Sequence, residues 1–377
     1  MKPRVIAALV AAAATVAQAG PPASPPRGAL YLGADLSYVN EMEDCGAVFR
    51  LHGKPVDAFK LLKREGGNIV RVRIWVNPTW TKYSTYPDVL KTIRRAHAAG
   101  LQALLDFHYS DDWADGGKQI APAAWANLST DEQVQALHDY TLDTLRRLDV
   151  AHQMPEMVQV GNETNPELLG GKVPGQPINW DRNARLLNAG IEAVQEAGRA
   201  GSLAPRIMLH IAQPENILPW FDAATKAGVH GYDVIGMSYY SKWSKWNLAQ
   251  LKQTIAEAKR RYGKDVIVVE TGYPFTLQGA DTAKNLLSED ALIPGYPATP
   301  EGQHKYMVDL TQLTVDAGGI GVVYWEPYWV STRCGTRWGH GSDWENATWF
   351  DYPKHEALPV FEWLHHKYRR ARQGERG

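Results

Sequence analysis

Two glutamates in the 377-residue chain each follow a short apolar run. Glu163 comes after the run 157–160 and the pair Gly161-Asn162, and Glu270 directly follows the run 266–269. Taking a carboxylate out of water is costly, so a carboxyl at the end of a buried strand needs a chemical reason. Two carboxyls across one pocket suit glycoside hydrolysis: a protonated one gives its proton to the leaving oxygen, and an ionised one attacks the anomeric carbon or activates water. The pair therefore predicts a glycosidase.

Other polar residues end the remaining apolar runs. Arg71 and Arg73, like Asp106 and His108, are two positions apart, so in an extended strand each pair points to one face. Arg71 is suited to keep one carboxylate ionised, and His108 and Tyr239 can orient hydroxyls or the carboxylates. The alternative for Arg71, Arg73 and Asp106 is a buried layer of ion pairs that only fills the core, and the sequence leaves both interpretations open.

The aromatic composition points the same way. The chain has 14 Trp and 17 Tyr but only 7 Phe. Trp and Tyr combine an apolar face with a polar edge, which suits ligands such as sugars. Trp75, Trp113, Trp325 and Trp329 lie near the ends of apolar runs and would supply stacking platforms, although core packing is the alternative for any one of them.

Eight short β-like runs alternate with amphipathic helical windows. The predicted strands are 30–36, 69–76, 102–107, 157–160, 207–211, 234–238, 266–269 and 321–325. The predicted helices are 56–65, 87–99, 130–148, 181–200, 218–227, 248–262, 300–317 and 356–370.

This order predicts an α/β fold, a single (β/α)8 TIM barrel. A doubly wound open sheet is the competitor, but it would normally carry a Gly-rich phosphate turn after its first strand, and Gly33-Ala34-Asp35 does not provide one. In a barrel, the carboxyl ends of all strands meet at one mouth, where active sites form. We therefore expect both glutamates to face each other there.

Composition, charge and the N-terminal sequence limit which partners and which cellular location we expect for the protein. The chain is 44% hydrophobic with a net charge of −1, which is ordinary for a globular protein and predicts no nucleic-acid partner. No apolar run reaches about 18 residues, so we expect no membrane anchor. Lys2, Arg4, an apolar stretch and Ala17-Gln18-Ala19 predict a secretory signal peptide at 1–19. We expect a Pro-rich leader at 20–28, the barrel at 29–370, a basic tail at 371–377, and a secreted monomer, periplasmic or extracellular.

The two cysteines are predicted to pair. Cys45 follows the first predicted strand and Cys334 the eighth. These strands become neighbours when a barrel closes, and both loops leave the same mouth. Because secreted proteins meet an oxidising environment, we predict a disulfide with Cα atoms roughly 4.4–6.8 Å apart. The alternative is two small, buried free thiols.

Several longer strings run through the chain in order. They are Gly33-Ala34-Asp35 with Glu41-Met42-Glu43, VRVRIWVNP at 70–78, LDFHYSDDWAD at 105–115, KQIAPAAW at 118–125, MVQVGNETN at 157–165, VVETGYPFT at 268–276 and SDWENATWFD at 342–351. Together they resemble glycoside hydrolase family 53, the arabinogalactan endo-β-1,4-galactanases, over essentially the whole mature chain. The Gly-Asn-Glu motif alone would indicate only the larger clan of retaining glycosidases.

The resemblance implies an endo-acting retaining enzyme on β-1,4-galactan. Glu163 would be the acid/base and Glu270 the nucleophile, and Asn162 would bind the sugar 2-hydroxyl. Arg71, His108 and Tyr239 fall at the clan's supporting positions. Weaker candidates for sugar contacts are Trp113, Asp115, Lys118, His210, Trp325 and Trp329. The chemistry requires no cofactor.

The resemblance also implies a candidate site for a structural calcium ion. The segment 281–285 is similar in spacing to a loop that holds calcium in bacterial members, and 342–345 matches the facing motif. Asp281, Asn285, Ser342 and Glu345 would supply the oxygen ligands that calcium prefers. The pattern is incomplete, because Ala283 replaces a His and Glu345 an Asp. Two solvated loops without an ion are the alternative.

Two rival functions remain open at this point. Another retaining endo-glycanase of the clan, a mannanase or a xylanase, would keep both glutamates and differ in its loops. A secreted glycan-binding protein on an inactive barrel is the second alternative, although the chain has both carboxyls. If the enzyme retains configuration, the two carboxyls should lie about 5–5.5 Å apart.

Overall fold

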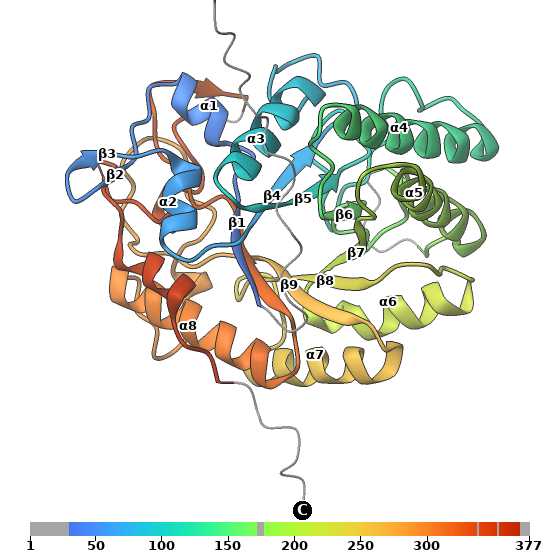
Figure 1. Cartoon of the computed structure of the whole chain (residues 1–377). Helices are drawn as coiled ribbons and strands as arrows, with labels where there is room; N and C mark the ends of the chain where they lie inside the picture. Colours follow the sequence, from blue (N-terminus) through green and yellow to red (C-terminus); the bar gives the residue numbers. More distant parts are fainter. Residues whose placement is uncertain (1–29, 172–176, 338, 353, 370–377) are drawn as a thin grey trace, which may run out of the picture.

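The structure is a computed structural model that describes residues 30–171, 177–337, 339–352 and 354–369. Eight parallel strands close into a barrel (Figure 1) in the order β1-β10-β9-β8-β7-β6-β5-β4. The barrel strands are β1 (Tyr31–Asp35), β4 (Ile69–Ile74), β5 (Gln102–Phe107), β6 (Met157–Val160), β7 (Arg206–Ala212), β8 (Val234–Tyr239), β9 (Asp265–Thr271) and β10 (Gly321–Tyr324). The predicted barrel is confirmed.

Helices surround the barrel in the α/β order that the sequence predicts (Figure 1). They are α2 (Ala58–Arg64), α3 (Tyr86–Ala98), α4 (Thr130–Val150), α5 (Trp180–Ala200), α6 (Pro214–Lys226), α7 (Leu248–Tyr262) and α8 (Pro300–Asp316), with a short α1 (Val39–Asp44) after β1. Capping residues mark where two of these helices begin. Ser129 and Asn247 form capping boxes at α4 and α7, which satisfy backbone N–H groups that have no partner inside the helix.

One predicted helix is wrong. The window 356–370 holds the 3₁₀ helix η3 (Pro359–His365), and the chain is extended at His366. Val360, Phe361, Trp363 and Leu364 are buried, and over so short a stretch this spacing fits a 3₁₀ helix as well as an α-helix. The structure also contains elements that were not predicted: α1, two further 3₁₀ turns, η1 (Glu289–Ala291) and η2 (Glu345–Ala347), and two small hairpins, β2–β3 (Arg50–Leu51, Lys54–Pro55) and β11–β12 (Gly335–Thr336, Gly339–His340).

Two layers of apolar side chains hold the barrel. The larger layer packs between the strands and the surrounding helices. A smaller one fills the barrel interior at the end away from the mouth. It comprises Ile69, Leu104, Met157, Met208, Val234, Ile267, Val269 and Val323. Above this floor the inward positions of β4 and β5 become charged, with Arg71 paired in register with Leu104, and Arg73 with Asp106. The apolar floor therefore leaves only the mouth for polar chemistry.

Barrel closure also joins the cysteines. β1 pairs with β10, as Tyr31 with Gly321, and Cys45 and Cys334 form a disulfide with Cα atoms 5.6 Å apart. The predicted pairing is confirmed. Within the described residues, no helix has the length and apolarity needed to cross a bilayer. The predicted signal peptide, leader and tail lie outside the described residues.

Candidate active site

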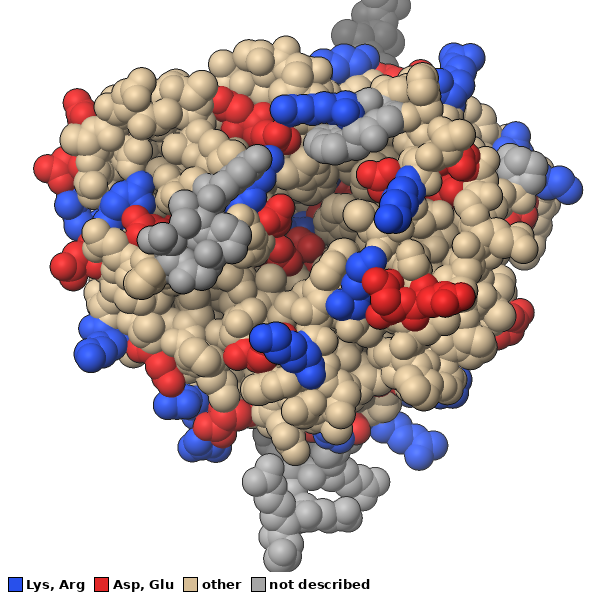
Figure 2. Space-filling view, turned by 180° about the vertical axis from the view of Figure 1, so that it is seen from behind, with Lys and Arg blue, Asp and Glu red and all other residues tan. Residues whose placement is uncertain are grey.

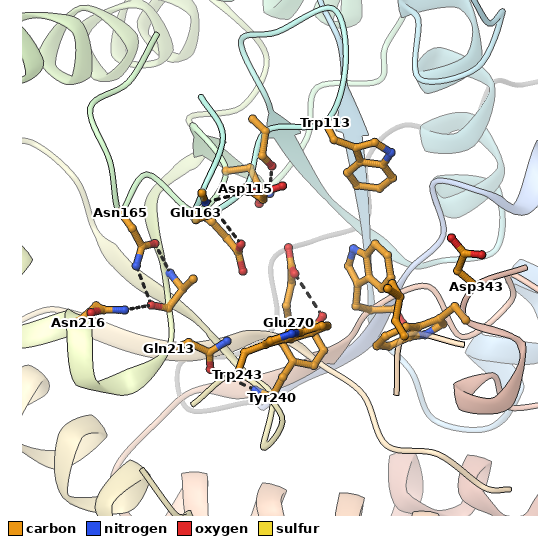
Figure 3. Close-up of a pocket in the computed structure, with 18 of the residues that line it drawn as sticks. Trp113, Asp115, Glu163, Asn165, Gln213, Asn216, Tyr240, Trp243, Glu270 and Asp343 are labelled. Carbon is orange, nitrogen blue, oxygen red and sulfur yellow. Dashed lines mark hydrogen bonds between the residues drawn. The ribbon is translucent and has the colours of Figure 1, made fainter. Parts of the chain in front are cut away.

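A pocket of about 650 Å³ lies at the carboxyl ends of the strands and contains both predicted catalytic glutamates. A hollow with acidic atoms in it is visible near the middle of the face in Figure 2. Figure 3 shows Glu163 and Glu270 pointing toward one another across the pocket. An oxygen of Glu163 and an oxygen of Glu270 lie within 4.8 Å of each other. The barrel thus brings together two carboxyls that are 107 positions apart in the sequence.

Left-handed backbone turns place side chains at this mouth. Tyr109, Glu163, Gln213 and Glu326 each follow a barrel strand and have φ between +44° and +64°. Such a conformation costs of the order of 1–3 kcal/mol for a non-glycine residue and is concentrated at functional sites. Before Glu163, Gly161 has φ +83°, and a Cβ there would lie 2.5 Å from Thr164 Cγ2. The Gly161-Asn162-Glu163 turn therefore needs its glycine.

A break in strand register brings in Glu270. Met237 of β8 pairs with Val268, but the next residue, Ser238, pairs with Glu270. The inner apolar layer includes Ile267 and Val269, so strict alternation would turn Glu270 outward. The irregularity shifts the alternation by one residue, as a β-bulge does. Glu270 consequently faces the pocket, opposite Ser238.

Arg71 is the centre of the charged network. Its Nη1 lies 2.9 Å from Asp35 and 2.7 Å from Glu270, and its Nη2 lies 2.8 Å from Asp106. The guanidinium also donates to Gln159 and to Asn162. A buried charge is tolerated only when it is paired and fully hydrogen-bonded. Both interpretations from the sequence therefore apply to Arg71: it forms buried ion pairs, and one of them is with a pocket glutamate.

Glu163 accepts hydrogen bonds but has no ion pair among the described residues. Its oxygens accept from Ser238 Oγ at 2.5 Å and from the Gly116 N–H at 3.0 Å. Burial raises the pKa of Glu163, while these two donors act in the opposite sense. A buried carboxyl without a cation is suited to hold a proton near neutral pH.

Glu270 differs from Glu163 because a cation, Arg71, contacts its carboxylate. Burial raises the pKa of Glu270 to about 8, the contact with Arg71 opposes this rise, and the neighbouring charge of Glu163 adds to it. Two carboxyls this close do not both ionise easily. When the pair holds one proton, that proton belongs on Glu163, because Arg71 directly compensates a charge on Glu270. Of the two carboxyls, Glu270 is thus the one that a cation contacts, and Glu163 is the one that only neutral donors contact.

The tyrosine that contacts Glu270 is Tyr240, and the prediction for Tyr239 is wrong in this respect. The Tyr240 hydroxyl donates to Glu270 Oε2 at 3.2 Å, whereas Tyr239 donates to the Trp246 carbonyl at 3.3 Å. Burial raises the pKa of Tyr240, so this hydroxyl keeps the proton that it donates. Neighbouring residues of a strand point to opposite faces, so only one of these two tyrosines can face Glu270, and it is Tyr240.

His210 and Ser238 form a chain of hydrogen bonds behind Glu163. His210 Nδ1 accepts from Gln159 Nε2, so its Nε2–H is left to donate to Ser238 Oγ at 2.9 Å. Burial holds the pKa of His210 well below its usual value, which keeps the ring neutral. Ser238 in turn donates to Glu163. His210 therefore positions other groups and does not line the pocket, contrary to its prediction as a sugar contact.

The other supporting candidates lie beside the carboxyls. His108 Nε2 is 3.0 Å from Asp106, and its Nδ1 accepts from the Trp75 ring and the Ala114 N–H. Asn162 donates to the Ala114 carbonyl at 2.8 Å and lines the pocket. His108 thus acts on the network beneath the pocket.

The predicted sugar contacts divide into two groups. Trp113, Asp115, Trp325 and Trp329 line the pocket. Lys118 does not; its Nζ pairs with Asp112 at 3.2 Å, on the loop after β5. Trp75, named above as a stacking candidate, is buried.

Arg73 supports this aromatic wall from below. Its guanidinium lies over the rings of Tyr38 and Trp113, at 4.3 and 4.2 Å from their centroids, and forms an ion pair with buried Glu326. Cation–π contacts of this kind strengthen when they are shielded from water. For Arg73 the core-filling interpretation is therefore the better one.

Several pocket residues were not anticipated. Asp35, Gln159, Ser238, Tyr240 and Gln213 contact the network or line the pocket. Asp35, Ser238 and Tyr240 could have been found, because each lies at the end of a predicted strand. Gln159 and Gln213 carried no signal that distinguishes them from ordinary polar residues.

The predicted calcium ligands gather where the loop after β9 meets the loop after β10, but hydrogen bonds already use most of their oxygens. Asp281 accepts from the Ala283 and Ser342 N–H groups, Ser342 Oγ donates to the Trp329 carbonyl, and Glu345 Oε1 accepts from Ala280. Glu345 Oε2 is buried without a described partner. Calcium takes six to eight oxygens, and the side-chain oxygens without a hydrogen bond are too few here for such a shell.

Comparison with known proteins identifies the family. The family model described as Glycosyl hydrolase family 53 matches residues 31–364. The chain belongs to this family. An arabinogalactan endo-beta-1,4-galactanase of Cellvibrio japonicus is 51% identical over 380 residues and covers 100% of both chains. An endo-beta-1,4-galactanase of Bacillus subtilis is 34% identical over 86% of this chain and 78% of its own.

A solved structure agrees with this assignment. The family 53 catalytic domain of Ignisphaera aggregans superposes with a TM-score of 0.82 and 30% identity, over 93% of this chain and 99% of that one. Family 53 membership confirms the predicted family, the barrel and the glycoside hydrolase class. It leaves open the role of each side chain, which the contacts above address.

Proposed function

We propose that the chain hydrolyses internal β-1,4-galactosidic bonds of galactan and type I arabinogalactan with retention of configuration. The observation that carries the proposal is the pair Glu163 and Glu270, whose nearest oxygens lie within 4.8 Å. This separation supports retention, because retaining enzymes keep their carboxyls about 5–5.5 Å apart and inverting ones about 6.5–9.5 Å. The galactanase names of the family 53 relatives support galactan as the substrate.

The reaction would proceed in two displacements. Glu270 attacks the anomeric carbon while Glu163 gives its proton to the leaving 4-oxygen, so the glycosidic bond breaks as a glycosyl–Glu270 ester forms. Glu163, now ionised, then takes a proton from water, and the resulting hydroxyl displaces Glu270. Both groups return to their starting states.

The surrounding residues act on these two steps. Arg71 and Tyr240 hold the Glu270 carboxylate at both of its oxygens, which fixes it for attack. Ser238 and the Gly116 N–H hold Glu163, and they stabilise the charge that appears when its proton leaves. Asn162, which lines the pocket, would bind the sugar 2-hydroxyl.

The location belongs to the same proposal. The positive, apolar and small-residue pattern of 1–19 supports export, and the disulfide between Cys45 and Cys334 suits an oxidising compartment. We propose a secreted monomer that meets polysaccharide outside the cytoplasm.

The decisive experiment is release of reducing ends from galactan, mannan and xylan by the purified mature protein. We expect galactan to be cleaved to oligosaccharides and the other two to remain intact. The isosteric variants Glu163→Gln and Glu270→Gln serve as matched controls and should lose this activity. Cleavage of mannan or xylan in place of galactan would favour another endo-glycanase, and binding of galactan without cleavage would favour a glycan-binding barrel.

A further inference from the structure

Glu163 lies in a backbone turn that is unfavourable by itself. Its φ of +44° is in the left-handed region, which a non-glycine residue keeps only when its surroundings hold it there. The sheet cannot do this, because β6 ends at Val160, three residues earlier. Contacts from outside β6 must therefore hold the turn at Asn162 and Glu163, and the loop after β5 provides them.

Two contacts from this loop reach the side chains of the turn. Asn162 Nδ2 donates to the Ala114 carbonyl at 2.8 Å, and the Gly116 N–H donates to Glu163 Oε2 at 3.0 Å. We call residues 114–119 the clamp segment. In Figure 3 this segment lies on the same side of the pocket as Glu163. The clamp segment thus follows the acid closely without belonging to its strand.

Gln119, the last residue of the clamp segment, acts on the backbone of the turn. Its Nε2 donates to the Asn162 carbonyl at 2.8 Å, to the Asp115 carbonyl at 3.0 Å and to the Glu163 carbonyl at 3.3 Å. Because a carbonyl oxygen can only accept, the amide atom that faces all three must be the nitrogen. One side chain therefore joins the backbone of the acid to the clamp segment.

The bond to Asp115 extends the reach of Gln119 to the carboxyl of the acid. The Asp115 carbonyl and the Gly116 N–H belong to one planar peptide group. Gln119 donates to the oxygen of this group, and its N–H donates to Glu163 Oε2. Fixing the peptide at its oxygen fixes the direction of its N–H. Gln119 thus holds both the main chain and, through one peptide, the carboxylate of Glu163.

Gln119 is itself held rigidly. Its N–H donates to the Gly171 carbonyl at 3.0 Å, and its carbonyl accepts the Gly171 N–H at 2.9 Å. Its side chain is only 2% exposed, and Oε1 is buried without a hydrogen-bond partner among the described residues. A buried acceptor without a partner is unfavourable. The oxygen end of the amide therefore contributes nothing, and the value of glutamine at this position lies in its donor end.

We propose that Gln119 is a positioning residue for the general acid: it holds the left-handed turn and the Asp115–Gly116 peptide, and so keeps the Glu163 carboxyl within reach of the leaving oxygen. This inference rests on the proposed function, since it takes Glu163 as the acid/base. Gln119 is not among the residues that line the pocket, so it acts on the reaction through Glu163 and not through the substrate.

Two aryl substrates separate acid catalysis from binding and folding. Phenyl β-galactobioside has a poor leaving group that needs the proton of Glu163, whereas 2,4-dinitrophenyl β-galactobioside releases a phenolate that leaves without a proton. Both carry the same galactobiosyl group. A loss of sugar binding or of folded protein therefore lowers kcat/KM equally for both, and a displaced acid lowers it for the phenyl substrate alone.

Gln119→Met keeps the length of the side chain and removes the donor. We expect the ratio of kcat/KM, phenyl over dinitrophenyl, to fall about ten- to hundredfold, because general acids contribute about 10²–10⁴-fold and a misplacement of about 1 Å can cost about 10²-fold. Gln133→Met is the matched control: Gln133 is buried, donates to the Trp125 carbonyl at 3.0 Å and does not line the pocket, so the ratio should not change. If Gln119→Met does not fold, Gln119→Asn, whose amide is one methylene too short, takes its place.

A double-mutant cycle shows whether Gln119 acts through the acid. Glu163→Ala alone should lower the same ratio, and adding Gln119→Met should lower it no further, because residues that serve one interaction are not additive. A further fall by the same factor would show that Gln119 acts independently of Glu163 and would overturn the inference. An unchanged ratio in Glu163→Ala would show that Glu163 is not the acid, and the proposed function would fail.

The outcomes distinguish this inference from the proposed function. A wild type that cleaves neither galactan nor the aryl substrates refutes both. A wild type that cleaves only the aryl substrates refutes galactan as the substrate, and the ratio still decides the role of Gln119. If the wild type cleaves galactan but Gln119→Met leaves the ratio unchanged, Gln119 does not position the acid, and this inference alone is overturned.

Discussion

Replacing Tyr240 by Phe removes one hydroxyl from the Glu270 carboxylate and leaves the ring in place. The hydroxyl donates to Glu270 Oε2 at 3.2 Å, which is long for an O–H···O hydrogen bond. Hydrogen bonds to charged groups contribute about 1.5–3 kcal/mol, so the lower end, about 1.5 kcal/mol, applies here. This corresponds to about one pKa unit.

The direction of the pKa shift of Glu270 follows from the negative charge of its ionised form. The hydroxyl stabilises the ionised form of Glu270, and its removal raises the pKa of that carboxyl. The acid limb of kcat/KM reports ionisation of the nucleophile in the free enzyme. In Tyr240→Phe the apparent pKa of this limb should therefore be about one unit higher than in the wild type. The assay is kcat/KM on 2,4-dinitrophenyl β-galactobioside across the acid limb.

Tyr239→Phe is the matched control. It removes a hydroxyl that donates to the Trp246 carbonyl, away from the carboxyls, so it should leave the acid limb in place. An unshifted limb in Tyr240→Phe, or an equal shift in Tyr239→Phe, would refute the assignment of Tyr240 to Glu270.

Four further expectations follow from the same contacts. Glu270→Gly should abolish hydrolysis, and azide should restore turnover of the aryl substrate with an inverted product; normal activity without azide would exclude Glu270 as the nucleophile. Ser238→Ala removes a donor to ionised Glu163, so the pKa of Glu163 and the basic limb of kcat/KM should move about one unit upward, and a downward shift would contradict the contact. Cys334→Ser should lower the free energy of unfolding by about 2–5 kcal/mol in denaturant titrations, unless the thiols are unpaired in the purified protein. Added calcium and EDTA should leave the melting temperature unchanged if hydrogen bonds alone join the two loops, and stabilisation by calcium would contradict this.

The sequence by itself determined the barrel and the chemical types at its mouth. Charged residues at every second position of 70–74 and 105–108, next to apolar partners, mark strands with one polar face, and eight such runs between helical windows leave few architectures. Parallel strands end at the same edge of the sheet, so the sequence alone predicts that Glu163 and Glu270 lie near each other. Closure of the same sheet made Cys45 and Cys334 neighbours.

Only the tertiary structure decided which side chains touch. The alternation along β9 assigns Glu270 to the outside, and the register change opposite Ser238 turns it inward. A one-residue difference likewise selects Tyr240 over Tyr239 as the partner of Glu270. Lys118 pairs with Asp112, and His210 bonds Ser238 behind Glu163, and neither contact could be read from the sequence. Side-chain direction reverses with each residue of a strand and changes at every bulge. The contacts of the site residues depend on pairing between strands that are distant in sequence. Local periodicity therefore predicts which types of residue lie at the site but not which of them touch.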